Sequence, residues 1–207
     1  MGLFNRRAAI GAVLSTAALA LAACGGKGAG GSIDGDMSLG DPAAKVKMIE
    51  YGSLSCIHCA NWAKDVFPAF KTKYIDTGKI HYTFRPFKLS PQDSYTAAGD
   101  LLGRCAGKDK YFGVIDALFH SQQEAFSTAG GAKAVLFSVG AQAGLSEDAV
   151  RACLSDSKAL VALDKRLNEP KAKEVTATPT FFIGDEKFES ELPLAEIDKA
   201  YAKVSGK

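Results

Sequence analysis

The sequence predicts an α/β fold in which a β-α-β unit is followed by a block of helices and then by a β-β-α unit. Strand patterns at 45–51 and 80–87 flank a helical pattern. Between 90 and 170 the strand patterns stop and helical patterns follow one another. A strand pattern returns at 178–183 and leads into a hairpin and a last helix. The length of 207 residues suits one such domain that carries a helical insert.

The first unit is predicted from the spacing of its apolar residues. Residues 37–40 indicate a short edge strand, and 45–51 alternate before ending in an apolar run, as a buried strand does. From 60 to 74 apolar residues recur at helical spacing, and Pro68 inside this segment predicts a kink. The aromatic-rich segment 80–87 is the second core strand and completes the β-α-β unit.

Four or five helices are predicted in the insert. Ser90 followed by Pro91 is typical of a helix start, because serine caps the first turn and proline lacks only an N–H that has no partner there. Glycines punctuate the later helices. The helical patterns cover about 91–105, 108–122, 132–143, 146–154 and 157–168.

The last unit is a predicted hairpin followed by a helix. Residues 178–183 have strand character, and 184–186 have turn chemistry. A short return strand at 187–188 follows, and 192–204 form an amphipathic helix.

The N-terminus predicts an export signal. Arg6 and Arg7 precede an uncharged, mostly apolar run at 8–23, which is shorter than the ~20 residues that a membrane-spanning helix needs. Removal of this signal removes its only charges and takes the net charge from +2 to zero. A nucleic-acid-binding surface, which requires a strongly basic patch, is therefore not expected.

The signal ends in Leu-Ala-Ala-Cys-Gly at 21–25, which resembles the lipobox of bacterial lipoproteins. We expect Cys24 to be lipidated, although ordinary signal cleavage at small residues also fits this stretch. Five glycines at 25–31 then predict a flexible tether. The predicted location is the periplasm or the extracytoplasmic membrane surface of a bacterium, where disulfides are stable.

These features divide the chain into four predicted parts. Residues 1–23 are the signal peptide and 24–36 the lipid-anchored tether. Residues 37–89 and 171–207 form the α/β domain, and 90–170 form the helical insert.

The chemistry is predicted at the junction between the first core strand and its helix. Cys56 and Cys59 lie there with two residues between them, a spacing typical of redox-active dithiols beside a β-α-β unit. A sulfur at a helix start faces unpaired N–H groups, which favour the thiolate by about 0.3–2 kcal/mol. His58 adds a positive charge or a donor beside it. Cys56 is therefore the expected attacking sulfur, and Cys59 the resolving one.

Two alternatives explain the same cysteine pair. Half of a zinc site would need two more ligands, and the sequence has no second Cys-x-x-Cys and no His-x-x-x-His. A purely structural disulfide across two intervening residues would close too short a loop to stabilise the fold much. We therefore expect no metal site.

The pair, the helical insert and the later Thr178-Pro179 together resemble the DsbA family, whose members have a thioredoxin fold with an inserted helical domain. The resemblance covers about residues 37–205. It implies that Cys56 is the nucleophile, Cys59 its buried partner, and His58 the residue that stabilises the thiolate. It also implies that Pro179 is a cis-proline facing the dithiol and that the backbone of Thr178 binds substrate peptide.

Two positions depart from the family and one acid matches it. Many members have proline at Ile57 and glycine at Ala177, so the redox poise and the loop geometry of this chain are expected to differ. Glu50, near the end of the buried strand, resembles a family acid that lies under the dithiol. If it is buried, its pKa is raised and it can relay the proton of Cys59; the alternative is a solvated strand residue.

The remaining cysteines, Cys105 and Cys153, both fall in the helical insert. In an oxidising compartment they can form a second disulfide, worth about 4 kcal/mol for a loop of this length. The alternative is two buried free thiols on different helices.

The resemblance implies an enzyme: an exported thiol-disulfide oxidoreductase that introduces disulfide bonds into secreted proteins by exchange through Cys56. Its expected partners are unfolded exported proteins with cysteine thiols and a DsbB-like, quinone-linked membrane oxidant. It is expected to act as a monomer without a soluble cofactor. The alternatives are a reductase or isomerase that a membrane donor keeps reduced, and a metallochaperone that holds copper(I) on the dithiol.

Overall fold

The computed structural model describes residues 1, 35–90 and 93–206. Five strands of these residues form one mixed sheet in the order β1-β3-β2-β4-β5. Strands β2 and β3 are parallel, and the other neighbouring pairs are antiparallel. The strands are β1 (Met37–Leu39), β2 (Val46–Gly52), β3 (Ile80–Pro86), β4 (Thr180–Ile183) and β5 (Glu186–Glu189).

Strand β2 lies at the centre of the sheet, and all its residues except Lys47 are buried. Its apolar residues Val46, Met48, Ile49 and Tyr51 are buried, and the charged Glu50 is buried among them. The predicted core strands and the predicted edge strand at 37–40 are confirmed, since β1 pairs only with β3.

The helix after β2 is broken where the sequence predicts a kink. Helix α1 (Ile57–Asp65) ends at Val66, and α2 (Phe67–Phe70) begins with Pro68 in its first turn. Proline is tolerated there because the first N–H groups of a helix have no partner within the helix. A π-helical turn (Lys71–Ile75) then leads toward β3.

The core between α1 and the sheet is organised around Trp62. Its ring lies 4.6–6.5 Å, between centroids, from the rings of Phe67, Phe70, Tyr82 and Phe181. Its indole N–H donates to the carbonyl of Leu192, at 2.9 Å. These contacts join α1 to β3, β4 and the segment before the last helix, and so hold the cysteine-bearing helix against the sheet.

The helical block contains six helices in the described residues, so the expected four or five is wrong. The predicted segment 108–122 contains one helix that ends at His120, and a further helix begins at Gln122 and continues beyond the segment to Ser127, because the backbone turns at Ser121 (φ −91°, ψ 8°). The helices are α3 (Ser94–Ala106), α4 (Lys108–His120), α5 (Gln122–Ser127), α6 (Gly131–Gln142), α7 (Glu147–Ser155) and α8 (Ser157–Leu167).

The start of α3 also differs from the prediction. Its cap is Asp93, whose Oδ1 accepts a hydrogen bond from the N–H of Thr96 at 3.1 Å, and not Ser90. Aspartate satisfies an N–H of the first turn in the same way as serine does. The predicted first-turn residue, Pro91, lies outside the described residues.

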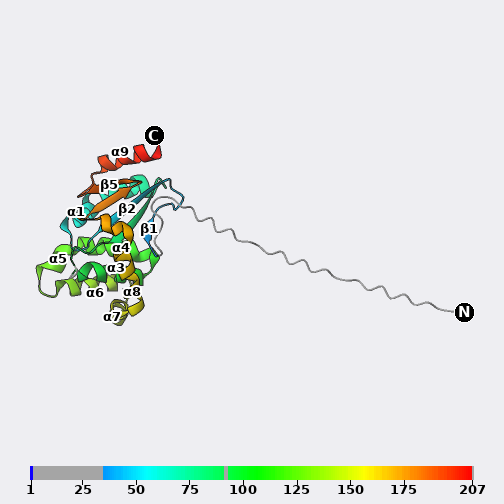
Figure 1. The fold of residues 1–207 in the computed structure, drawn as a ribbon. Helices are drawn as coiled ribbons and strands as arrows, with labels where there is room; N and C mark the ends of the chain where they lie inside the picture. Colours follow the sequence, from blue (N-terminus) through cyan, green and yellow to red (C-terminus); the bar gives the residue numbers. More distant parts are fainter. Residues whose placement is uncertain (2–34, 91–92, 207) are drawn as a thin grey trace.

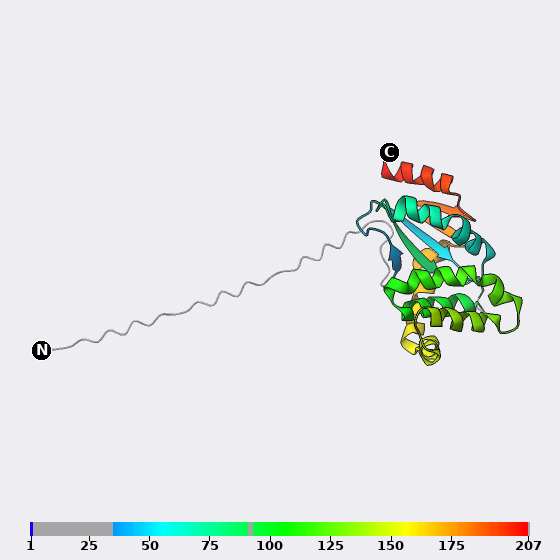
Figure 2. The ribbon, with the colours of Figure 1, turned by 180° about the vertical axis from the view of Figure 1, so that it is seen from behind.

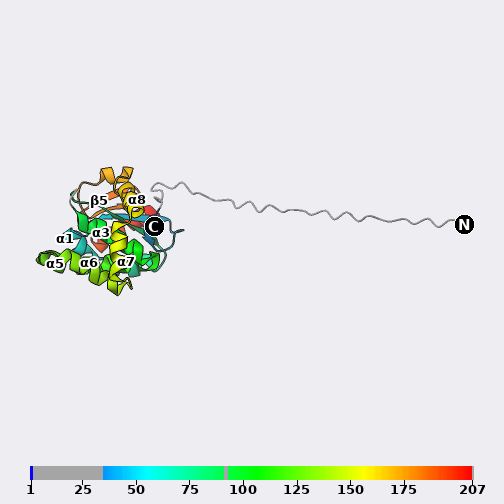
Figure 3. The ribbon, with the colours of Figure 1, turned by 90° about the horizontal axis from the view of Figure 1, so that it is seen from below.

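The sheet and the helical block lie toward opposite ends of the molecule. In Figure 1 and in the reverse view of Figure 2, the sheet lies toward the end formed by α9 (Leu194–Ser205), and α7 marks the other end. Figure 3, from below, shows α5, α6 and α7 along one side. The predicted hairpin and terminal helix are confirmed as β4, β5 and α9.

The predicted signal peptide beyond Met1, the lipidation site Cys24 and the tether as far as residue 34 lie outside the described residues. The last tether residue, Asp36, is bound to the domain, because both its carboxylate oxygens accept hydrogen bonds from Arg85 at 2.8–3.1 Å. Buried Arg85 also pairs with Glu169, just after α8. In the described part of the chain, no helix has the length and apolar character that a membrane crossing requires.

Cys105 and Cys153 are joined by a disulfide in the structure. The bond links the end of α3 to α7, and the two Cα atoms are 6.1 Å apart. It closes a loop with a sequence separation of 48 residues that contains α4, α5 and α6.

We predict that Cys105→Ala/Cys153→Ala lowers the free energy of unfolding by up to about 4 kcal/mol, because the unfolded chain gains loop entropy. Urea unfolding measures the change. The matched control is Cys56→Ser/Cys59→Ser, which keeps the structural bond. A loss below about 1 kcal/mol relative to wild type would mean that the bond contributes little to folding.

Candidate active site

Cys56 and Cys59 meet at the start of α1. Cys56 is the N-cap, with extended backbone (φ −89°, ψ 123°), and its carbonyl accepts the first helical hydrogen bond, from Ala60 at 3.1 Å. Cys59 lies within the first turn and is fully buried, whereas Cys56 is 7% exposed. Both thiols are free in this structure, which therefore represents the reduced pair.

The surroundings make the two thiols chemically different. A hydrogen bond from the Cys59 thiol, opposed by burial, lowers the pKa of Cys56 to about 5. The backbone N–H groups of Cys59 and His58 add to this effect, as the helix start predicts. Burial holds the pKa of Cys59 well above its usual range. One sulfur is thus ready to attack as a thiolate, while the other retains its proton.

The imidazole of His58 lies beside Cys56 and is held by an acid that the sequence reasoning missed. Its Nδ1 is 2.8 Å from Oε1 of Glu191, a residue between β5 and α9. The hydrogen bond to Glu191 raises the pKa of His58, and the charge of Cys56 raises it further. Glu191 is 133 residues away in the chain, so no local pattern indicates the pairing.

The Thr178–Pro179 peptide bond is cis, which confirms the predicted isomer. The carbonyl of Thr178 accepts a hydrogen bond from the Cys56 thiol at 3.2 Å. The loop before β4 therefore lies directly against the Cys56 sulfur, with the backbone of Thr178 in contact with it.

Glu50 is buried beneath the pair, so the alternative of a solvated residue is wrong. Its Oε2 accepts a hydrogen bond from the hydroxyl of Tyr82 at 2.5 Å, and its Oε1 has no partner among the described residues. Burial raises the pKa of Glu50 to about 8, although the Tyr82 hydrogen bond opposes the shift. Gly52 makes room for this carboxylate, because a Cβ there would lie 2.9 Å from Oε1.

A buried polar cluster holds the loop that enters α1. Asp93 accepts hydrogen bonds from the hydroxyls of Ser53 and Ser55 at 2.8–2.9 Å and from the hydroxyl of Thr96 at 2.9 Å. Burial alone would raise the pKa of Asp93, but these bonds and the N–H of Thr96 lower it. Sequence reasoning missed Asp93, although aspartate directly before a helical segment is a recognisable capping signal.

A second polar contact comes from α5. The amide of Gln122 donates to the carbonyls of Leu54 and Cys56, at 2.7 and 2.9 Å. Nothing in the local sequence indicates this contact, since the partners are more than 60 residues apart.

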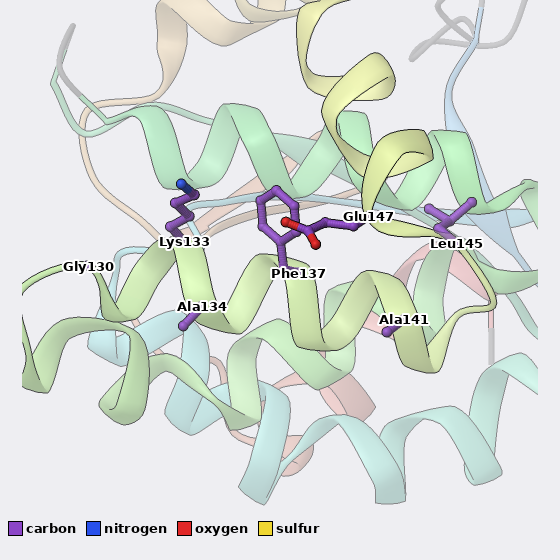
Figure 4. Close-up of a pocket in the computed structure, with 7 residues that line it drawn as sticks. All are labelled: Gly130, Lys133, Ala134, Phe137, Ala141, Leu145 and Glu147. Atoms are coloured by element: carbon purple, nitrogen blue, oxygen red, sulfur yellow. The ribbon is translucent and has the colours of Figure 1, made fainter.

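A large hollow on the helical block is separate from this site. It has a volume of about 490 Å³ and lies along α6 and the start of α7, with Phe137 and Glu147 among its walls (Figure 4). No cysteine lines this hollow, so it is not part of the site around Cys56 and Cys59. Among the described residues, no three metal-binding side chains gather into a cluster.

The comparisons with known proteins place this chain in a family. Residues 32–202 match a family model described as thioredoxin, and the chain belongs to the thioredoxin family. A Rickettsia bellii protein named "Putative protein-disulfide oxidoreductase" is 33% identical over 84% of this chain and 68% of its own length. A Rickettsia conorii protein with the same description is 34% identical over 72% of this chain and 53% of that protein.

Solved structures agree with this assignment. Wolbachia pipientis alpha-DsbA1 has a TM-score of 0.73 and 32% identity, covering 84% of this chain and 95% of that one. Bacillus subtilis BdbD, at 19% identity and a TM-score of 0.74, shares the fold over 85% of this chain and 96% of its own. Within the thioredoxin family the chain is a DsbA-like protein-disulfide oxidoreductase.

We predict that Cys56 titrates with a midpoint of about 5. The lowered pKa stabilises the folded reduced form fully above the unfolded thiol's pKa of about 8.5, and this contribution is lost as the pH falls through the folded value. Thiolate absorbance and the pH dependence of alkylation measure the midpoint, with Cys56→Ser as the blank. A midpoint at the ordinary thiol value would contradict the assignment of Cys56 as the stabilised thiolate.

We predict that Glu191→Gln raises the pKa of Cys56, because His58 loses the partner that favours its charged form. NMR titration of His58 should show its pKa falling in the same variant. The matched control is Glu196→Gln, at an exposed acid on α9 that pairs with Lys199. An unchanged Cys56 midpoint in Glu191→Gln would show that the charge of His58 does not reach the sulfur.

Proposed function

We propose that this chain is an exported dithiol oxidase that introduces disulfide bonds into secreted proteins. The observation that carries the proposal is the place of Cys56 at the N-cap of α1, where backbone N–H groups lower its pKa, with its sulfur 3.2 Å from the Thr178 carbonyl oxygen. Stabilising a thiolate stabilises the reduced pair, so the oxidised pair readily passes its disulfide to another protein.

The exchange uses two steps at one sulfur. A substrate thiolate attacks Sγ of Cys56 in the Cys56–Cys59 disulfide, and a mixed disulfide forms as Cys59 leaves. A second substrate thiolate then attacks the substrate sulfur of that bond, and Cys56 leaves as a thiolate. Two electrons pass from the substrate to the pair, and the substrate gains one disulfide. The low pKa of Cys56 makes it a good leaving group in the second step.

Glu50 is the proposed proton carrier for the buried sulfur. Cys59 leaves as a thiolate in a site that strongly disfavours its charge, and it must gain a proton. The charge of Glu50 raises the pKa of Cys59, so the two groups interact, and the Glu50 pKa of about 8 leaves Glu50 protonated near neutral pH. It can donate that proton and later recover one.

The loop of Thr178 and Pro179 is the proposed substrate contact. The carbonyl of Thr178 is at the sulfur, so an extended peptide that pairs with the Thr178 backbone places its own cysteine beside Cys56. The substrates are unfolded exported proteins with cysteine thiols, and backbone pairing suits them because it does not depend on their side chains.

The proposed location is the extracytoplasmic membrane surface or the periplasm of a bacterium. The signal at 1–23 and Cys24 support export with a lipid anchor. The tether joins this anchor to the α/β domain at 37–89 and 171–207, with the insert at 90–170. The reduced pair then requires reoxidation, for which a DsbB-like, quinone-linked membrane protein is the proposed partner.

We predict that the wild-type protein, in its oxidised form, speeds the refolding of a reduced, disulfide-requiring protein and that Cys56→Ser abolishes the effect. Recovery of the refolded protein's activity measures the rate. The control Cys105→Ala/Cys153→Ala should retain most of the activity, because its redox pair is intact. Equal rates with wild type and Cys56→Ser, or no acceleration by wild type, would exclude an oxidase.

A further inference from the structure

Gln122 belongs to the helical block, yet its side chain is buried against the loop that carries Cys56. It begins α5 and is 4% exposed. Its Nε2 donates to the carbonyl oxygens of Leu54 and Cys56 at 2.7 and 2.9 Å. One amide thus holds the backbone on both sides of Ser55, in the turn that leads from β2 into α1.

The carbonyl of Cys56 is part of the same turn as the N–H groups that face the sulfur. It accepts hydrogen bonds from both Gln122 and the N–H of Ala60. The orientation of this carbonyl depends on the ψ angle of Cys56. The same angle sets how α1 is turned relative to Sγ of Cys56, and so the direction of the N–H groups of His58 and Cys59. Those N–H groups are among the contacts that stabilise the thiolate.

The break between α4 and α5 accounts for the inward direction of Gln122. Helix α4 ends at His120, and the backbone of Ser121 turns before α5 begins. The next residue, Gln123, is exposed. Two glutamines side by side therefore have different surroundings, one against the redox loop and one at the surface.

The effect of Gln122 on Cys56 is separable from that of the charged groups. Cys59 and His58 act from α1, Glu50 acts from β2 beneath, and Glu191 acts through His58. The neutral amide of Gln122 adds no charge, so its influence comes from hydrogen bonds to the backbone.

We propose that Gln122 is a positioning residue for the redox pair, because its two hydrogen bonds keep the N–H groups at the start of α1 directed toward the Cys56 sulfur. The helical block then sets how strongly the thiolate is stabilised and how oxidising the pair is. The inference rests on Cys56 being the attacking sulfur of the proposed function.

The test compares Gln122→Met with Gln123→Met. Methionine keeps the size of glutamine but has no amide donors, so only the first variant releases the two carbonyls. We expect the Cys56 midpoint to rise by about one pH unit and the equilibrium constant for reduction by glutathione to fall ~10-fold in Gln122→Met. Gln123→Met should match wild type.

Urea unfolding of the oxidised and reduced forms separates positioning from a merely structural role. A positioning role destabilises the reduced form of Gln122→Met more than the oxidised form, since only the reduced form contains the thiolate. Equal losses in both forms, with a wild-type midpoint, would overturn the proposal. If Gln122→Met does not fold, Gln122→Asn is titrated instead, because its side chain is one methylene shorter and its amide does not reach the carbonyls. A wild-type Cys56 midpoint in Gln122→Asn would also overturn the proposal.

The thiolate titration and the glutathione equilibrium need no protein substrate. A wild-type protein that fails to accelerate refolding would therefore end the oxidase proposal, whereas unchanged Cys56 chemistry in Gln122→Met would end this one alone.

Discussion

The hydrogen bond from the Cys59 thiol to the Cys56 sulfur is the interaction on which the active site depends. A helix start lowers a thiol pKa by at most about one and a half units, so it does not account alone for a Cys56 pKa of about 5. The larger cause is a neighbouring thiol that burial prevents from losing its own proton. The asymmetry between the sulfurs thus follows from the depth at which α1 packs on the sheet around Trp62.

Separate parts of the chain hold this geometry. Asp93 and Gln122, from the helical block, bind the loop that enters α1. Thr178 and Glu191, from the C-terminal part, reach the sulfur and the imidazole beside it. Polar side chains of the helical block thus hold the loop that carries Cys56. The Cys105–Cys153 disulfide holds two helices of the same block together.

Most of the fold could be predicted from local patterns. The strands, the broken helix at Pro68 and the terminal hairpin follow from apolar spacing and from proline chemistry. The errors lie in the insert, where the break at Ser121 and the Asp93 cap were missed. Ser121 is not a helix breaker by type, so the sequence does not signal the turn that separates α4 from α5.

The sequence by itself determined where the two cysteines lie, since a Cys-x-x-Cys between a strand and a helix places both sulfurs in one turn, at the start of α1. It also indicated Pro179, Glu50 and His58, though their roles were carried over from a family resemblance. Only the tertiary structure decided that Glu50 is buried and that Glu191 and Gln122 reach the site. Burial and contacts across more than 60 residues depend on how layers pack, and no local periodicity encodes them.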